Sequence, residues 1–483
     1  MGLRQLAAKG VLWSGIQNVC STLIGVVVFL VLACLLEPGA FGLLGMASAC
    51  IAIAEIFLKQ GLAQAIVQRA ELHPGHLDTA FWMSVVVGVV LTALGLSGAG
   101  IVADLLNEAR LAPVLRWLSL GFVIGAFGNT HLAILQRQMA FKSLAFRSLL
   151  AVGVSGVVGI GMALAGCGVW SLVGQNLTML VVGSAVLWAA SDWRPGCGVS
   201  TRHFKDLIGF GGSVMGVEAM TVVNGRATDL LIGIFLGAQS LGYYHMGSKL
   251  FMLITHMLTQ TLSAVALPTF SRLQHDLTQM RNAFATATQI SCLIGFPAFL
   301  GLAVIAPELI DGVLGAKWGR SLPVMQILAF AGLLQAAFYF NRPAIMAAGK
   351  PAWVLKLAFL NAVTNILLVL LVVRWGIIAV AVAFTLRGYG FAPVLLWMTR
   401  RAIHMEPAAV LRQYLAPATA SLVMVLVVLG ARLLLAGSMG PRPLLVLCVL
   451  LGAVVYTGII RLAAPTLMQK VRDLVRLALR PPE

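Results

Sequence analysis

The sequence predicts an all-α integral membrane protein with about 14 transmembrane helices, arranged as two six-helix lobes followed by two further helices. Two features of composition and one of pattern lead to this fold class. Of the 483 residues, 60% are hydrophobic and only 10% are charged, and the mean hydropathy is +0.96. A water-soluble protein of this length needs far more polar surface. Apolar stretches of roughly 20 residues, the length that crosses about 30 Å of hydrocarbon, recur from Val11 to Arg461.

Fourteen such stretches follow one another along the chain. The first comes after Arg4 and Lys9, as a secretory signal would, but its apolar run is long and no small-residue cleavage site closes it. We therefore expect it to remain as the first helix. The predicted spans are 11–36, 42–64, 80–103, 113–135, 145–165, 169–190, 207–235, 240–267, 284–306, 321–347, 352–373, 376–398, 414–435 and 443–463.

The positions of Lys and Arg predict the orientation in the membrane. With a cytoplasmic N-terminus, 22 of these residues fall in inner loops and tails, and 7 fall in outer loops. Cytoplasmic loops are enriched in Lys and Arg, so both termini are expected to be cytoplasmic. This bias accounts for most of the net charge of +17 without a nucleic-acid partner. Basic segments also attract anionic membrane lipids, by about 1 kcal/mol per residue near the surface.

The sequence contains none of the common catalytic, metal-binding or cofactor-binding motifs. The 7 Cys residues form no Cys-x-x-Cys pair and are interpreted as packing residues. A phosphate-binding loop, His-Glu-x-x-His and Gly-x-Ser-x-Gly are all missing. We therefore expect no enzymatic activity, no metal and no cofactor. A membrane polysaccharide polymerase is the enzymatic alternative, which the short outer loops disfavour.

One short sequence occurs twice. LEPGAFGLLGM at 36–46 returns as LGAQSLGYYHM at 236–246, with Leu, Gly and Met in the same places. Further along, at a slightly larger offset, Gly168 aligns with Gly376. The alignment maps the first six helices onto the next six. Because six is an even number, both copies enter the membrane in the same direction, which makes them parallel repeats related by an axis along the membrane normal. Chance matching among Leu, Gly and Ala is the alternative.

The repeat predicts three parts of the chain. They are a first six-helix lobe at 1–195, a second at 196–400, and helices 13 and 14 with a basic tail at 401–483. Two parallel lobes leave a cleft between them, and transport by alternating access needs little more than this cleft and a rocking motion.

The two copies of the repeated sequence are expected to be short outer turns. Pro38 and Gly39 make the first of them stiff and compact. We predict that the turns are gate hairpins, with Ala40 and Ser240 facing each other across the outer mouth of the cleft. The alternative is that they are compact connectors far from it.

Seven charged residues lie away from the ends of the predicted helices, namely Glu55, Lys59, Glu218, Arg226, Asp229, Lys249 and Arg387. An ionised side chain facing lipid costs at least about 2.5–3.5 kcal/mol, so these should face the bundle interior or a wet cavity. Four cations against three acids indicate an anionic cargo.

We predict that the four cations bind the cargo together with Asn224. The three acids are the predicted ion-coupling residues, because a carboxyl group shielded from water can exchange a proton in each transport cycle. Sodium coupling and uncoupled transport are the alternatives.

Each of these residues also has a structural interpretation. Glu55 and Lys59, four residues apart, can pair within one helix, and so can Arg226 and Asp229, three residues apart. The cations at 249 and 387 can extend to the membrane surface or pair with another helix.

Short patterns spread along the chain carry a resemblance to a known family. They are Trp13-Ser14, Leu36-x-Pro38-x-x-Phe41-Gly42, Gly61-Leu62-x-x-Ala65-x-Val67-x-Arg69, Asp78-x-Ala80-Phe81-Trp82, Gly168-x-Trp170-Ser171-Leu172, Asp229-Leu-Leu-Ile-Gly233-x-Phe235-Leu236-Gly237, Leu241-Gly242-Tyr243-Tyr244, Pro268-x-Phe270-Ser271-Arg272-Leu273-Gln274 and Lys317-Trp318. In this order the chain resembles the polysaccharide-transporter branch of the MOP superfamily. It is similar in particular to Wzx-type flippases of the colanic-acid-exporter kind.

The resemblance implies a protein of the bacterial inner membrane with fourteen helices in two lobes. It implies the movement of undecaprenyl-diphosphate-linked oligosaccharides from the inner to the outer leaflet, for exopolysaccharide or lipopolysaccharide assembly. Helices 13 and 14 would offer a lipid-facing groove for the polyprenyl tail, and a polysaccharide polymerase and a chain-length regulator are the implied protein partners. A multidrug or cation exporter of the same superfamily is the alternative, disfavoured by the four cations.

Overall fold

The computed structural model describes residues 3–59, 62–68, 73–196, 198–273, 276–435 and 437–463, and within these ranges the chain forms helices and no β-strand. Twelve segments of the described residues are long and apolar enough to cross a membrane. Large apolar side chains remain exposed on them, among them Leu434 at 83% and Leu462 at 86%. Such surface is stable only against lipid, since in water each exposed apolar side chain costs free energy. The structure confirms an all-α, multi-span membrane protein.

The helix α8 holds the two remaining predicted spans. It runs from Thr201 to Arg272, but Gly237 inside it has φ 79° and ψ 172°, which no helix contains. Glycine takes a positive φ at little cost because it has no Cβ. The predicted spans 207–235 and 240–267 therefore lie on either side of a real break, and about 14 membrane helices are compatible with the structure.

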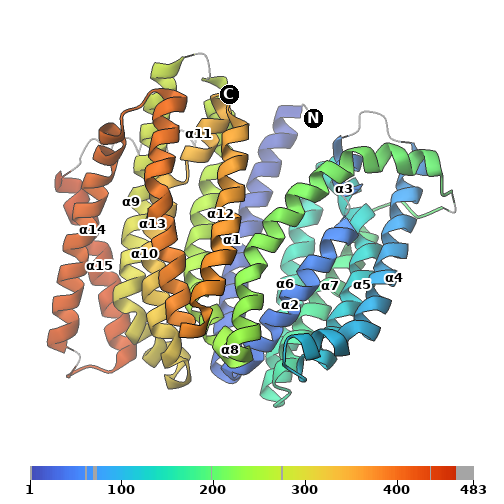
Figure 1. The fold of residues 1–483 in the computed structure, drawn as a ribbon, viewed down its shortest axis with the longest axis horizontal. Coiled ribbons are helices and arrows are strands. Elements are labelled where there is room, and N and C mark those ends of the chain that lie inside the picture. The colour runs from blue at the N-terminus through green and yellow to red at the C-terminus, as the bar shows by residue number, and fades with distance from the viewer. Residues whose placement is uncertain are drawn as a thin grey trace. The chain divides into compact units, whose positions relative to one another are not determined.

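The chain divides into two compact units, residues 1–242 and 243–483 (Figure 1). The first contains α1 (Leu3–Leu35), α2 (Pro38–Lys59), α3 (Leu62–Gln68), α4 (Pro74–Leu105), α5 (Leu111–Arg137), α6 (Phe141–Leu164), α7 (Val169–Ala190) and α8 up to Gly242. The second contains the rest of α8, α9 (Leu277–Leu309), η1 (Ile310–Leu314), η2 (Ala316–Ser321), α10 (Leu322–Phe338), α11 (Asn341–Ala347), α12 (Pro351–Val372), η3 (Val373–Trp375), α13 (Ile377–Ile403), α14 (Pro407–Leu435) and α15 (Pro441–Ala463). The predicted three-part division at 195 and 400 stays a prediction.

Helices pair in the same order in the two units. In the first unit α4 packs on α5, α6 on α7, and α5 on α7; in the second α9 packs on α10, α12 on α13, and α10 on α13 (Figure 1). Gly168 directly precedes α7 with φ 57°, and Gly376 directly precedes α13 with φ 99°. The two glycines are 376 − 168 = 208 residues apart, the offset at which the sequence aligns them. The packing order thus follows the internal repeat.

The predicted span 321–347 consists of two helices. α10 ends at Phe338 and α11 begins at Asn341. Pro343 has no N–H to donate to the carbonyl of Tyr339, and its ring would clash with that carbonyl in a continuous helix. The buried Nδ2 of Asn341 donates to Thr399 Oγ1 at 2.6 Å, which ties α11 to α13.

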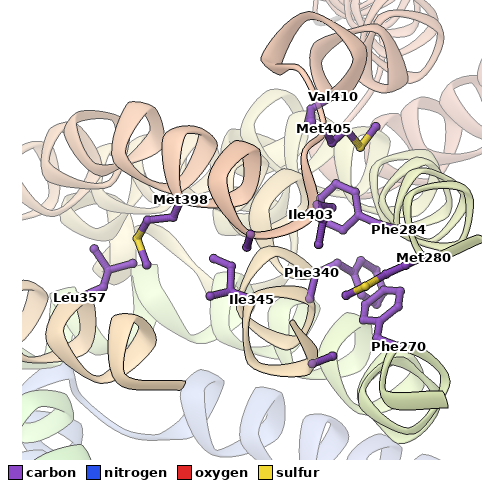
Figure 2. Close-up of a cluster of buried hydrophobic side chains, with 13 residues drawn as sticks. Phe270, Met280, Phe284, Phe340, Ile345, Leu357, Met398, Ile403, Met405 and Val410 are labelled. Carbon is purple, nitrogen blue, oxygen red and sulfur yellow. The ribbon is translucent and has the colours of Figure 1, made fainter. Parts of the chain in front are cut away.

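A cluster of buried apolar side chains packs several helices of the second unit together at one end of that unit (Figure 2). Figure 2 shows Phe284 of α9 beside Ile403 at the end of α13, and Phe270 beside Phe340. The last two rings lie 6.2 Å apart, edge to face. Met405 and Val410 belong to the same cluster, so the connection between α13 and α14 is held by apolar packing.

Candidate functional site

A polar pocket lies among α10, α11, α12 and α13 in the second unit. Its volume is about 400 Å³, and its polar lining consists of Gln335, Tyr339, Arg342 and Asn361. Arg342 is the second residue of α11, so the break before Pro343 places this residue at the pocket. Sequence reasoning assigned Arg342 to an inner loop and missed it. The signal was its position inside the predicted span 321–347, next to a proline.

Arg387 of α13 lies beside this pocket. Its Nη1 donates to the carbonyl oxygen of Asn361 on α12 at 2.7 Å, and its guanidinium carbon lies 5.3 Å from the centre of the Phe384 ring. Its Nε is buried and has no hydrogen-bond partner among the described residues. A buried arginine donor without a partner is uncommon, because most buried polar atoms in proteins are hydrogen-bonded. The inter-helix contact predicted as the alternative also exists.

Lys249 lies on a neighbouring helix of the same unit. It is an exposed residue of α8, two positions before Phe251. The Phe251 ring packs edge to face against Phe384, with centroids 6.3 Å apart. Phe384 therefore contacts both Arg387 and the α8 segment that carries Lys249.

The other predicted residues belong to the first unit. Arg226 Nη1 and Asp229 Oδ2 of α8 form an ion pair at 3.4 Å, with the aspartate side chain 12% exposed and the arginine side chain 41% exposed. Asn224, on the same helix, and Glu55 of α2 are half-buried. The structure thus contains the pair within one helix that the spacing of Arg226 and Asp229 allows.

Two predicted residues cannot be placed in this way. The side chains of Lys59 and Glu218 lie outside the described residues.

The two copies of the repeated sequence contact each other through their backbones. Gly42 has no room for a Cβ, which would meet the carbonyl group of Ala238, and a Cβ on Gly242 would meet the carbonyl group of Pro38. The contact is reciprocal, since 238 − 38 = 200 and 242 − 42 = 200. Both glycines are buried. The segments that carry Ala40 and Ser240 therefore lie together, and glycine is required wherever two backbones approach this closely.

An apolar groove of about 430 Å³ runs between α9, α14 and α15. These three helices lie side by side in Figure 1. The groove is lined by residues such as Pro297, Gly301, Met424 and Gly452, and its polar groups are those of Tyr456 and Thr457. A volume of this size and composition suits a hydrocarbon chain.

Three polar contacts fix the α14–α15 hairpin to α9 and to η1, which directly follows it. Arg432 pairs with the buried Glu308, and Arg442 Nε donates to the carbonyl of Gly312 at 2.8 Å. Nearer the other end, Tyr456 Oη donates to the carbonyl of Leu293 at 2.7 Å. The groove is therefore held open between anchored helices.

The fold is that of a known class of all-α, multi-span membrane proteins. The structure is similar to the lipid II flippase MurJ in its inward closed conformation, with a TM-score of 0.76, 14% sequence identity, and coverage of 95% of this chain and 100% of that one. At this identity the likeness concerns the fold.

The sequence comparisons are more specific. The chain is 28% identical over 342 residues to the lipopolysaccharide biosynthesis protein WzxC of Escherichia coli K12. This alignment covers 70% of this chain and 69% of the relative. It is 27% identical over 461 residues to the succinoglycan biosynthesis transport protein ExoT of Rhizobium meliloti. This alignment covers 92% of this chain and 91% of the relative. A family model described as polysaccharide biosynthesis protein matches residues 31–323. The chain belongs to this family, which confirms the resemblance drawn from the short patterns.

Proposed function

We propose that the protein is a flippase that moves undecaprenyl-diphosphate-linked oligosaccharide repeat units from the cytoplasmic to the periplasmic leaflet, for exopolysaccharide or lipopolysaccharide assembly. Its relatives carry the names of polysaccharide biosynthesis and transport proteins, and the fold is shared with a lipid II flippase. The same names agree with a transporter rather than an enzyme. Alternating access of the two repeats is the proposed mechanism.

The apolar groove is the observation that carries this proposal. A water-soluble drug or sugar has no use for a hydrocarbon-lined channel between α9, α14 and α15, whereas a polyprenyl carrier must keep its tail in an apolar environment. Burial of each CH₂ group contributes about 0.8 kcal/mol. Thr457 and the anchored Tyr456 are the groove's polar groups, and they leave most of its length apolar.

The cations supply the complementary half of the cargo site. Arg342 lines the pocket, Arg387 contacts the backbone of the pocket-lining residue Asn361, and Lys249 lies on the adjoining helix segment. Arginine and lysine make charge-assisted hydrogen bonds to phosphate oxygens, about twice as strong as neutral ones. We propose that these residues hold the diphosphate. Arg226, Lys59 and Asn224 are proposed as the substrate-binding residues of the first unit.

Coupling and gating are part of the same proposal. Glu55, Glu218 and Asp229 are proposed to exchange protons in a proton-driven antiport, with Asp229 held beside Arg226 between exchanges. The reciprocal contact of Gly42 and Gly242 is proposed to close the outer gate, with Ala40 and Ser240 at its tip.

The proposed setting is the bacterial inner membrane, with both termini in the cytoplasm. The distribution of Lys and Arg supports this orientation. A polysaccharide polymerase and a chain-length regulator would then act on the product in the periplasm, and both are proposed as protein partners.

Reconstitution in proteoliposomes tests the proposal. The protein should accelerate the movement of a fluorescent undecaprenyl-diphosphate-linked oligosaccharide between leaflets, and it should restore polymer production in a flippase-deficient strain. A parallel assay with cationic drugs addresses the multidrug alternative. Drug efflux without any acceleration of lipid movement would overturn the flippase proposal.

A further inference from the structure

Two tryptophan side chains stack at one end of the second unit. The rings of Trp353 on α12 and Trp397 on α13 are nearly parallel, with centroids 5.9 Å apart and an interplanar angle of 15°. Lys350 Nζ lies 4.6 Å from the centre of the Trp353 ring, and the guanidinium carbon of Arg401 lies 5.3 Å from the centre of the Trp397 ring. Lys350 Nζ also donates to the backbone carbonyl of Arg401 at 2.6 Å. We call these four residues the Trp–cation cluster.

The stretch of chain that carries this cluster contains far more positive than negative charge. Lys356 and Arg400 lie next to the cluster in sequence and are exposed, which brings the local count to four cations. The sequence between residues 312 and 472 contains a single acid, Glu406. A charge of this sign and size at the end of a helix pair attracts an anion rather than a structural partner.

The cluster continues into an apolar surface on both helices. Trp353 is followed at seven-residue intervals by Leu360 and Leu367, which are 50% and 60% exposed. Seven residues make nearly two helical turns, so these three side chains lie on one face of α12. On α13, Leu386 precedes Trp397 by 11 residues, about three turns, and the two are 64% and 51% exposed.

On α13 this surface faces away from the polar pocket. Trp397 follows the pocket-lining residue Gly388 by nine residues, which is about two and a half turns and places it on the opposite face of α13. An exposed apolar stripe on a membrane helix contacts acyl chains, and tryptophan is enriched where such a surface meets the headgroups.

We propose that the Trp–cation cluster, with Lys356 and Arg400, binds the headgroup of an acidic phospholipid of the surrounding bilayer. The phosphate accepts hydrogen bonds from the Arg400 and Arg401 guanidinium groups, and the acyl chains lie along the stripes below the two tryptophans. Four cations favour a headgroup with a net negative charge over a zwitterionic one. The cationic group of a zwitterionic headgroup would be repelled by the basic side chains of the site. The proposal stands independently of the cargo that the protein carries.

Native mass spectrometry of the purified full-length protein tests this site. Phosphatidylglycerol should be retained about tenfold more strongly than phosphatidylcholine. Arg400→Gln/Arg401→Gln should remove most of this preference, since basic residues near the membrane surface attract anionic headgroups. Arg412→Gln/Arg461→Gln is the matched control, because it removes two exposed cations away from the tryptophans. Equal retention of the two lipids, or an equal loss in the control, would overturn the proposal.

Two further measurements separate the remaining explanations. Competition by millimolar inorganic phosphate would point to a free anion as the ligand and overturn the lipid assignment. A photoactivatable phosphatidylglycerol should label the wild-type protein within residues 350–360 and 394–401, which keeps the test valid if the double variant does not fold. Labelling confined to other segments would count against the site.

Discussion

At the scale of single residues, α9 contains two prolines whose missing donors are replaced from neighbouring helices. Pro297 leaves the carbonyl of Leu293 without its helical N–H, and Tyr456 Oη donates to that carbonyl at 2.7 Å. Pro307 does the same to the carbonyl of Ala303, to which Gln326 Nε2 donates at 3.0 Å. Within a membrane an unpaired carbonyl is costly, so prolines persist where other groups satisfy the freed oxygen.

Replacing Tyr456 by Phe should destabilise the protein by about 1–3 kcal/mol, the cost of an unsatisfied buried acceptor. Thermal unfolding in detergent measures this loss. The same substitution in a Pro297→Ala background should cost much less, because alanine restores the helical N–H donor to Leu293. Equal losses in the two backgrounds would show that Tyr456 acts through packing alone.

Charge at the pocket is the second feature at this scale. Arg387→Met keeps most of the side-chain volume and removes the charge, so it should lower complementation of a flippase-deficient strain at least about tenfold, in line with the 1.5–3 kcal/mol of a charged hydrogen bond. Arg342→Met should act in the same direction. Arg374→Met, at an exposed position of η3, serves as the control. Unchanged transport with normal membrane levels in both pocket variants would remove the pocket from the cargo site.

At the scale of helices, the two copies of the repeated sequence meet through glycine. Gly42→Val and Gly242→Val should each separate the two backbones, since neither position has room for a Cβ. Gly39→Val is the matched control, because nothing lies within 4 Å of a Cβ at that position.

The gate hypothesis makes this separation measurable. In a background without native Cys, Ala40→Cys and Ser240→Cys should crosslink best in the inward-open state and stop transport reversibly. Adding Gly42→Val should lower the crosslinking yield, whereas adding Gly39→Val should not. Crosslinking that leaves transport intact would reduce the contact to a connector with no role in gating.

The groove between α9, α14 and α15 is the other feature at this scale. A Cβ at Gly452 would contact Val428 at 3.5 Å, so Gly452→Phe should fill the groove and slow the movement of a substrate with a full-length polyprenyl tail. A substrate with a short tail should be affected less. Gly458→Phe, on the same helix but in open surroundings, should leave both rates unchanged. An equal effect of Gly452→Phe on the two substrates would argue against a tail-binding groove.

At the scale of the whole molecule, the parallel repeat allows one rocking motion to expose the cargo site to either side in turn. The free energy for this cycle must come from outside the protein. If protons supply it, collapsing the pH gradient should slow transport in proteoliposomes, and Glu55→Gln, Glu218→Gln or Asp229→Asn should make transport insensitive to the gradient. Transport by the wild type that ignores the gradient would indicate an uncoupled mechanism.

The sequence by itself determined the fold class, the division between the spans 207–235 and 240–267, and the internal repeat. Insertion in a bilayer depends on the length and hydropathy of each segment, which are local properties that can be read along the chain. The alignment of Gly168 with Gly376 also rests on a local property. Each residue directly precedes a helix and has a positive φ, which favours glycine at both positions.

Only the tertiary structure decided which side chains meet. Arg342 reaches the pocket because Pro343 starts a new helix, and Arg387 contacts Asn361 because α12 packs on α13. The groove requires α9 beside a hairpin that follows it by about a hundred residues in the chain, and Gly42 meets Ala238 across almost two hundred. Inside lipid the segments are equally apolar on most sides, so close packing of small residues and a few hydrogen bonds select the neighbours. Close packing and hydrogen bonding depend on two helix surfaces at once, so the hydropathy of a single segment does not predict them.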